Sequence, residues 1–88
     1  MEIIFSKEAQ EDILLWKKSG DKKGMNRITE LLHAIEQSPF EGIGKPELLK
    51  HNLAGYWSRR INREHRLVYR VINDFKIEVI ALRFHYDK

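Results

Sequence analysis

Two prolines and two glycines fall within the eight residues "PFEGIGKP" at positions 39–46, and this segment divides the chain into two parts. No helix continues through it, because proline removes a backbone donor and glycine destabilises helical backbone. Before it, apolar residues recur at helical spacing; after it, they alternate as in β-strands. The sequence therefore predicts an α+β domain whose helices precede its sheet.

The first part predicts one strand and two helices. The apolar run "EIIF" at 2–5 indicates a strand, and Ser6 is a favoured helix N-cap residue. Gly20 ends the first helix, Asp21 caps the second, and Ser38 with Pro39 ends that one. The helices form a hairpin whose apolar stripe packs on the sheet. The stripe consists of Ala9, Ile13, Trp16, Met25, Ile28, Leu32 and Ile35.

The second part predicts three strands, at residues 56–61, 65–72 and 75–84. They are rich in β-branched and aromatic residues and are separated by "NRE" and "ND", which suit tight turns. Together they form an antiparallel meander, so the order β-α-α-β-β-β describes a single domain over 1–88. In the middle strand Leu67, Tyr69 and Val71 alternate with Arg66, Val68 and Arg70. One sheet face therefore meets the helices and the other carries arginine.

Charge is divided unevenly along the chain. Residues 1–44 hold six Lys or Arg and eight Asp or Glu, whereas residues 45–88 hold ten and five. A basic half favours a polyanionic partner: nucleic acid, an acidic protein or an anionic membrane surface. The alternative is a solvated basic face that serves only solubility.

Other features narrow the class of protein. The absence of cysteine excludes disulfides and thiolate metal sites, and no apolar run is long enough to span a membrane. No motif for a phosphate loop or a magnesium or zinc site is present. We therefore expect a cytoplasmic protein with no membrane contact, no cofactor and no metal.

Two residues are candidates for acid–base chemistry. Glu47 lies among cations and can accept a proton from a substrate hydroxyl, although it can equally pair with Lys50 or cap a short turn. His85, near the end of "ALRFHY", is a candidate acid, although a single imidazole among aromatic residues is more often a packed strand end. Position alone favours the structural role for both.

Five arginines lie on neighbouring strands or their turn, where several can converge on one phosphate. Strand alternation allows only Arg59 or Arg60 to share a face with Arg66. Aromatic residues interleaved with them can stack on bases, although core packing is the better interpretation for Trp57. The arginines are Arg59, Arg60, Arg63, Arg66 and Arg70, and the aromatic residues are Tyr56, Trp57, Phe84 and Tyr86.

Several motifs together carry a resemblance that spans nearly the whole chain. The "GKPE" loop, the "LKHNLAGYWSRRI" run, the "EHRLVY" strand and the "HY" pair occur in this order. In these motifs the chain resembles the YoeB/Txe toxins of the RelE superfamily, which are mRNA interferases of type II toxin–antitoxin modules. The resemblance implies two helices packed on an antiparallel sheet, and cleavage of mRNA in the ribosomal A site.

The resemblance also implies roles for individual residues. Glu47 falls on the family's general base, Arg66 on its phosphate-stabilising arginine and His85 on its general acid. Tyr86 falls on an active-site tyrosine, which often ends the chain in close relatives but here is followed by Asp87 and Lys88. The remaining matches, Lys50 and Arg60, fall on positions that bind substrate phosphates.

The implied activity is a metal-independent endoribonuclease in which the 2′-hydroxyl of the RNA attacks the adjacent phosphorus. The implied partners are mRNA, the ribosome and a YefM/Axe-like antitoxin that neutralises the toxin, with a homodimer or a toxin–antitoxin heterocomplex as possible assemblies. The alternative functions are a non-catalytic RNA- or ribosome-binding module and a protein whose basic face receives an acidic peptide.

Overall fold

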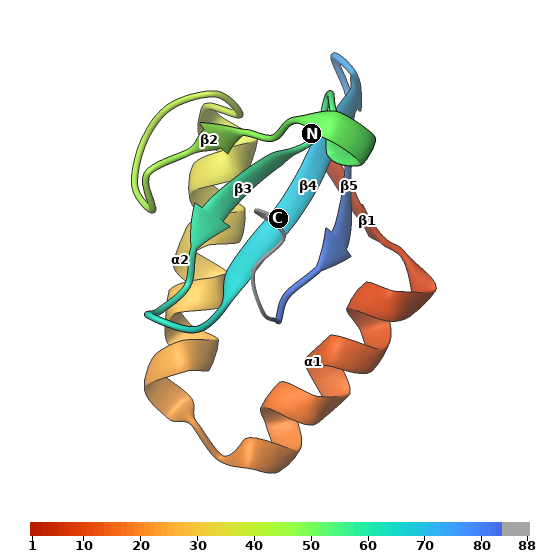
Figure 1. Cartoon of the computed structure of the whole chain (residues 1–88). Helices are drawn as coiled ribbons and strands as arrows, with labels where there is room; N and C mark the ends of the chain where they lie inside the picture. The colour runs from red at the N-terminus through yellow and green to blue at the C-terminus, as the bar shows by residue number, and fades with distance from the viewer. Residues whose placement is uncertain (84–88) are drawn as a thin grey trace.

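The computed structural model describes residues 1–83, and it contains two helices packed on a five-stranded sheet. The predicted α+β class is confirmed. The helices lie on one side of the sheet and diverge from the turn that joins them (Figure 1). The elements are β1 (Glu2–Phe5), α1 (Lys7–Ser19), α2 (Lys22–Gln37), β2 (Glu47–Leu48), the 3₁₀ turn η1 (His51–Leu53), β3 (Trp57–Arg60), β4 (Arg66–Asn73) and β5 (Lys76–Ala81).

The helix boundaries follow the predicted capping residues. The Ser6 hydroxyl accepts a hydrogen bond from the Ala9 backbone N–H, and the Asp21 carboxylate accepts one from Gly24. Gly20 ends α1 with a φ of 72°, in the left-handed region that glycine adopts readily. Local sequence is therefore sufficient to set both helix starts and the turn between them.

The sheet has the strand order β1-β5-β4-β3-β2. Strands β3, β4 and β5 form the predicted antiparallel meander, and β2 pairs antiparallel with β3. Strand β1 lies parallel to β5, so the sheet is mixed rather than purely antiparallel as predicted. The two-residue strand β2 is not among the strands that the sequence predicts. It is too short to show alternation in sequence, and it forms because Glu47 and Leu48 pair with Ser58 and Trp57 of β3.

The two faces of the sheet differ as the alternation of β4 predicted. Leu67 and Tyr69 belong to the main core with the helix residues Ala9, Trp16 and Ile35. On the other face a smaller apolar cluster is formed by Leu49, Val68 and Ala81, with Leu53, Tyr56 and Ile80 packed against it. We call this second face, which also carries Arg60, Arg66 and Arg70, the open face. No helix within residues 1–83 is long and apolar enough to cross a membrane.

Candidate active site

Arg66, the first residue of β4, is held in place by β3. Its Nε donates a hydrogen bond of 2.8 Å to the Ser58 hydroxyl, and its Nη2 lies 3.4 Å from the Ser58 carbonyl oxygen. The Lys45 carbonyl oxygen lies 3.5 Å from the same Nη2. The side chain is only 8% exposed. A buried guanidinium with these acceptors has one orientation, so its free edge points in a fixed direction.

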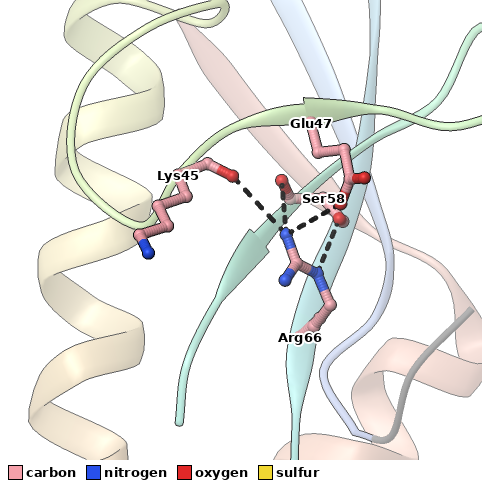
Figure 2. A network of polar contacts seen from close by, with 4 residues as sticks. All are labelled: Lys45, Glu47, Ser58 and Arg66. Carbon is pink, nitrogen blue, oxygen red and sulfur yellow. Dashed lines mark hydrogen bonds and ion pairs between the residues drawn. The ribbon is translucent and has the colours of Figure 1, made fainter. Parts of the chain in front are cut away.

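Glu47 lies beside that guanidinium on the edge strand β2. Its Oε1 is 3.6 Å from Arg66 Nη2, and its side chain is 62% exposed. Figure 2 shows the carboxylate, the guanidinium and Ser58 converging between β2, β3 and β4. At 3.6 Å the contact is an ion pair rather than a well-formed hydrogen bond. The Glu47 carboxylate is therefore attracted to Arg66 by charge, but no short hydrogen bond fixes its orientation.

This arrangement sets a proton acceptor next to an anion-binding group. Within residues 1–83 no hydrogen bond occupies Arg66 Nη1, and Glu47 has no ion pair with Lys50. A hydroxyl group next to a phosphate could therefore meet Glu47 while the phosphate meets Arg66. The proposed pairing of Glu47 with Lys50 is not found, because the carboxylate turns toward the sheet.

Two adjacent arginines of β3 point in opposite directions. Arg60 pairs with Arg66 across the strands and is exposed on the open face. Arg59 is fully buried on the helix side, and its Nε donates to the Tyr69 hydroxyl. The rest of its guanidinium donates to the carbonyl oxygens of Ser38, Glu41 and Ile43. Arg59 thus anchors the loop after α2, and Arg60 is the arginine that shares the face of Arg66.

The other candidate residues are distributed as follows. Lys50 is exposed directly before η1. Trp57 is half-buried against the main core, as predicted, and its ring contacts Phe40 at 5.2 Å. The predicted acid His85 and its neighbour Tyr86 lie outside the described residues.

A family model described as the YoeB-like toxin of bacterial type II toxin–antitoxin systems matches residues 5–86. This chain belongs to that family. Toxin YoeB of Synechocystis is 53% identical over 88 residues, covering 100% of both chains. The family resemblance that the motifs indicated is thereby confirmed.

Solved structures of YoeB toxins agree with this fold. The YoeB/ParE toxin from Agrobacterium tumefaciens superposes with a TM-score of 0.91 at 42% identity, covering 98% of this chain and 100% of that one. Two structures from Staphylococcus aureus, each 49% identical with 98% of both chains covered, are similar too. They are a YoeB–YefM heterotetramer, with a TM-score of 0.85, and a YoeB dimer, with a TM-score of 0.87.

Ser58 is a site residue of this YoeB-like toxin that sequence reasoning did not single out. Alternation in "YWSRRI" places it on the face of Arg60, which was the available signal. Its role depends on facing Arg66 and pairing with Glu47, and neither relationship can be seen in the sequence of β3 alone.

The candidate site is not part of the cavity at the start of α2. That cavity, of about 860 Å³, lies between the start of α2 and the turn after β3, where Gly24, Arg27 and Asn62 are among its lining residues. It contains neither Glu47 nor Arg66. Within residues 1–83, no three His, Asp or Glu side chains gather as a metal site would require.

Proposed function

We propose that this YoeB-like toxin is an endoribonuclease that cleaves mRNA in the ribosomal A site. The observation that carries the proposal is the exposed Glu47 carboxylate beside the fixed Arg66 guanidinium, with 3.6 Å between the charged groups. Strand cleavage by an internal hydroxyl needs a base at the 2′-oxygen and a cation at the phosphate beside it. These two groups are the ones that β2 and β4 bring together.

In the proposed reaction Glu47 takes the proton of the 2′-hydroxyl as the oxygen bonds to the adjacent phosphorus. Arg66 and Lys50 stabilise the negative charge that develops on the phosphoryl oxygens. The bond from phosphorus to the 5′-oxygen then breaks, and His85 donates a proton to that leaving oxygen. Tyr86 lies next to His85 in the sequence, and we assign it to the same site. No step in this scheme requires a metal.

Arg60 has a supporting role in this proposal. It pairs with Arg66 across the strands and is exposed on the open face, so it can bind a neighbouring phosphate of the same RNA strand. Acid and base assistance each contribute roughly 10²- to 10⁴-fold. The remaining acceleration must come from holding the strand in line for attack, which we assign to the ribosome.

The carboxylate distinguishes this proposal from a non-catalytic RNA- or ribosome-binding module. A binding surface for RNA gains affinity from each cation and loses it from each nearby anion. Glu47, exposed beside Arg66, would only weaken such a surface. A nuclease, in contrast, needs a proton acceptor at this point.

The family membership supports two partners. YoeB from Staphylococcus aureus forms a heterotetramer with YefM and also a dimer. We propose that a YefM/Axe-like antitoxin neutralises this toxin by covering the open face, and that the free toxin can form a homodimer. Because its substrate would be translated mRNA, the toxin would act in the cytoplasm.

The chemistry of the RNA ends tests the proposal. Cleavage by the 2′-oxygen leaves a 2′,3′-cyclic phosphate or 3′-phosphate upstream and a free 5′-hydroxyl downstream. A 2′-deoxy or 2′-O-methyl nucleotide just before the cut should stop cleavage, while binding stays nearly unchanged because one hydroxyl adds little to a contact with many phosphates. A 5′-phosphate on the downstream fragment would mean that water, and not the 2′-oxygen, attacks the phosphorus. If the toxin leaves mRNA uncut, the non-catalytic RNA- or ribosome-binding module would be the function.

A further inference from the structure

One buried arginine binds much of the loop that leads from α2 to β2. Arg59 of β3 is 0% exposed, and its Nη2 donates hydrogen bonds of 2.6 Å to the Ser38 carbonyl oxygen and 3.0 Å to that of Glu41. Its Nη1 donates one of 3.1 Å to the Ile43 carbonyl oxygen. The donors of a guanidinium lie in one rigid plane, so the carbonyl oxygens that they bind cannot shift independently of one another.

Tyr69 of β4 extends this contact. Its hydroxyl accepts a hydrogen bond of 3.1 Å from Arg59 Nε and donates one of 2.6 Å to the Pro39 carbonyl oxygen. Tyr69 is also 0% exposed and belongs to the main core, on the helix side of the sheet. We call residues 38–45 the anchored loop. Two side chains of the sheet therefore bind its backbone from the helix side.

The anchored loop ends beside the candidate base. The Arg60 backbone N–H donates a hydrogen bond of 2.7 Å to the Gly44 carbonyl oxygen, and the Lys45 carbonyl oxygen lies 3.5 Å from Arg66 Nη2. Glu47 follows Lys45 by two residues. Figure 2 shows Lys45 and Glu47 approaching the Arg66 guanidinium from the same segment of chain. The path of the anchored loop therefore sets where Glu47 enters the sheet.

The backbone at the end of the anchored loop is held in an unfavourable conformation. Lys45 has a φ of 52°, which residues other than glycine rarely adopt, and the proline after it restricts its backbone further. Gly44 before it has a φ of 85°. A Cβ atom there would lie 2.7 Å from Leu31 Cδ2 and 3.0 Å from Arg59 Cβ. Strained backbone persists only where surrounding contacts over-determine it, so the anchors impose this path.

Strand β2 by itself gives Glu47 little support. It has two residues, lies at the edge of the sheet, and pairs only with β3 among the described strands. Apolar packing would tolerate small shifts of such a strand, whereas hydrogen bonds weaken steeply when their angles change. A catalytic group must lie within about 0.5 Å of its productive position. The directional bonds of the anchored loop meet that requirement better than packing does.

We propose that Arg59 is a positioning residue for the general base: by binding the anchored loop from the helix side, it sets where Glu47 stands relative to Arg66. This inference rests on the proposed function, in which Glu47 takes the proton of the 2′-hydroxyl. Arg59 is fully buried and does not touch the RNA. It acts only through the anchored loop.

The test measures single-turnover cleavage of ribosome-bound mRNA at saturating toxin, and ribosome affinity, for Arg59→Lys and Gly44→Ala. Lysine keeps the charge but cannot bind three carbonyl oxygens in one plane, and the alanine Cβ pushes the loop away from β3. Each should slow cleavage about 10- to 100-fold, because a displacement near 1 Å can cost about 10²-fold. Ribosome affinity should change by less than about twofold, since the phosphate-binding cations are kept.

Gly20→Ala is the matched control for Gly44→Ala. It also places alanine at a positive φ, of 72°, but nothing lies within 4 Å of the added Cβ atom. It belongs to the turn between α1 and α2, so it should cleave at the normal rate. Circular dichroism confirms that every variant is folded at the assay temperature.

Arg59→Lys and Gly44→Ala are also made in a Glu47→Gln background, where the residual cleavage is followed over longer times. A residue that acts only through Glu47 has nothing left to position there. Each substitution should therefore add less than about twofold to the loss from Glu47→Gln. A residue that only supports the fold would slow both backgrounds by the same factor.

The outcomes separate this inference from the proposed function. Losses that multiply with the loss from Glu47→Gln would overturn the positioning role alone, as would normal cleavage by Arg59→Lys or Gly44→Ala. A loss of ribosome affinity as large as the loss of rate would also overturn it, because the loop would then act in binding. A fully active Glu47→Gln protein would remove the base from the proposed function and the positioning role with it. If Arg59→Lys does not fold, Gly44→Ala and its double variant decide.

Discussion

Ser58 accepts the Arg66 Nε hydrogen bond from a neighbouring strand, at 2.8 Å and out of contact with solvent. The serine is 1% exposed, so the bond is not weakened by competing water. It fixes the Nε edge of the guanidinium, and no residue among 1–83 forms a hydrogen bond with Nη1. The guanidinium is thus oriented in advance, which the proposed function requires for electrostatic stabilisation of a phosphoryl transition state.

Removing that acceptor should impair both stability and cleavage. Ser58→Ala leaves the Arg66 Nε without its partner in a buried position, which costs about 1 to 3 kcal/mol in free energy of unfolding. The released side chain should slow cleavage by roughly tenfold or more. Ser58→Thr keeps the hydroxyl and should recover most of the rate. Urea denaturation and single-turnover cleavage measure the two effects, and equal rates for Ala and Thr would contradict the role given to the hydroxyl.

Glu47→Gln should stop cleavage and toxicity without loss of stability. The substitution removes the base, whose contribution is about 10²- to 10⁴-fold, while the exposed site and the loose ion pair make the folding cost small. Growth after induction, mRNA 5′-end mapping and thermal unfolding measure the three quantities. Lys50→Gln is a useful comparison. It should lower the cleavage rate without abolishing it, because only one of the cations that stabilise the phosphoryl charge is lost. A Glu47→Gln variant that cleaves at the normal rate would show that Glu47 is not the base.

Arg66→Lys should separate chemistry from binding. Lysine keeps the positive charge but loses the planar fork and the bond to Ser58, so cleavage should fall far more than ribosome affinity. Equal losses would reduce Arg66 to a binding residue. Affinity of the native toxin should also weaken steeply as salt rises from low to physiological concentration, because phosphate contacts release counterions. A filter-binding titration over salt concentration measures that slope, and a flat response would argue against a phosphate-binding face.

The adjacent arginines of β3 should behave oppositely in unfolding experiments. Arg59→Met leaves the carbonyl oxygens of Ser38, Glu41 and Ile43 without their donor, and we expect a loss of about 3 kcal/mol or more. Arg60→Met changes an exposed side chain and should shift the free energy of unfolding by less than about 0.5 kcal/mol. Urea denaturation of the two variants measures the difference. Similar losses in both would contradict the buried and exposed assignments.

Tyr69 should make stability depend on alkaline pH. Burial raises its pKa above the ordinary value of 10.0, while the hydrogen bond and charge of Arg59 act in the opposite direction. The contribution of Tyr69 to the free energy of unfolding is therefore complete at pH values below its pKa in the unfolded chain. That contribution is lost as the pH rises through its pKa in the folded protein, because the unfolded chain gives up the proton first. The free energy of unfolding should fall by up to about 1.4 kcal/mol per pH unit in that window, beyond other titrating groups. Tyr69→Phe should show a shallower slope in urea denaturation at stepwise pH, and parallel slopes would contradict the assignment.

Several features of this protein were determined by local sequence. The caps at Ser6 and Asp21 and the turn at Gly20 depend on neighbours within a few residues, so they could be predicted before the fold was known. The alternation of β3 and β4 likewise limited the arginine that shares the face of Arg66 to Arg59 or Arg60, because successive side chains of a strand point to opposite sides. The pairing of β3 with β4 decided for Arg60.

The relationships that make a site were decided by tertiary structure. Glu47 meets Arg66 only because the loop after α2 returns to add β2 at the edge of β3, and a two-residue strand carries no pattern of its own. Asp12 meets Leu82 across 70 positions of sequence because β5 lies under α1. Periodicity reports which side of an element a residue faces, but the partner it meets there depends on strand order and loop path, which only the packed chain determines.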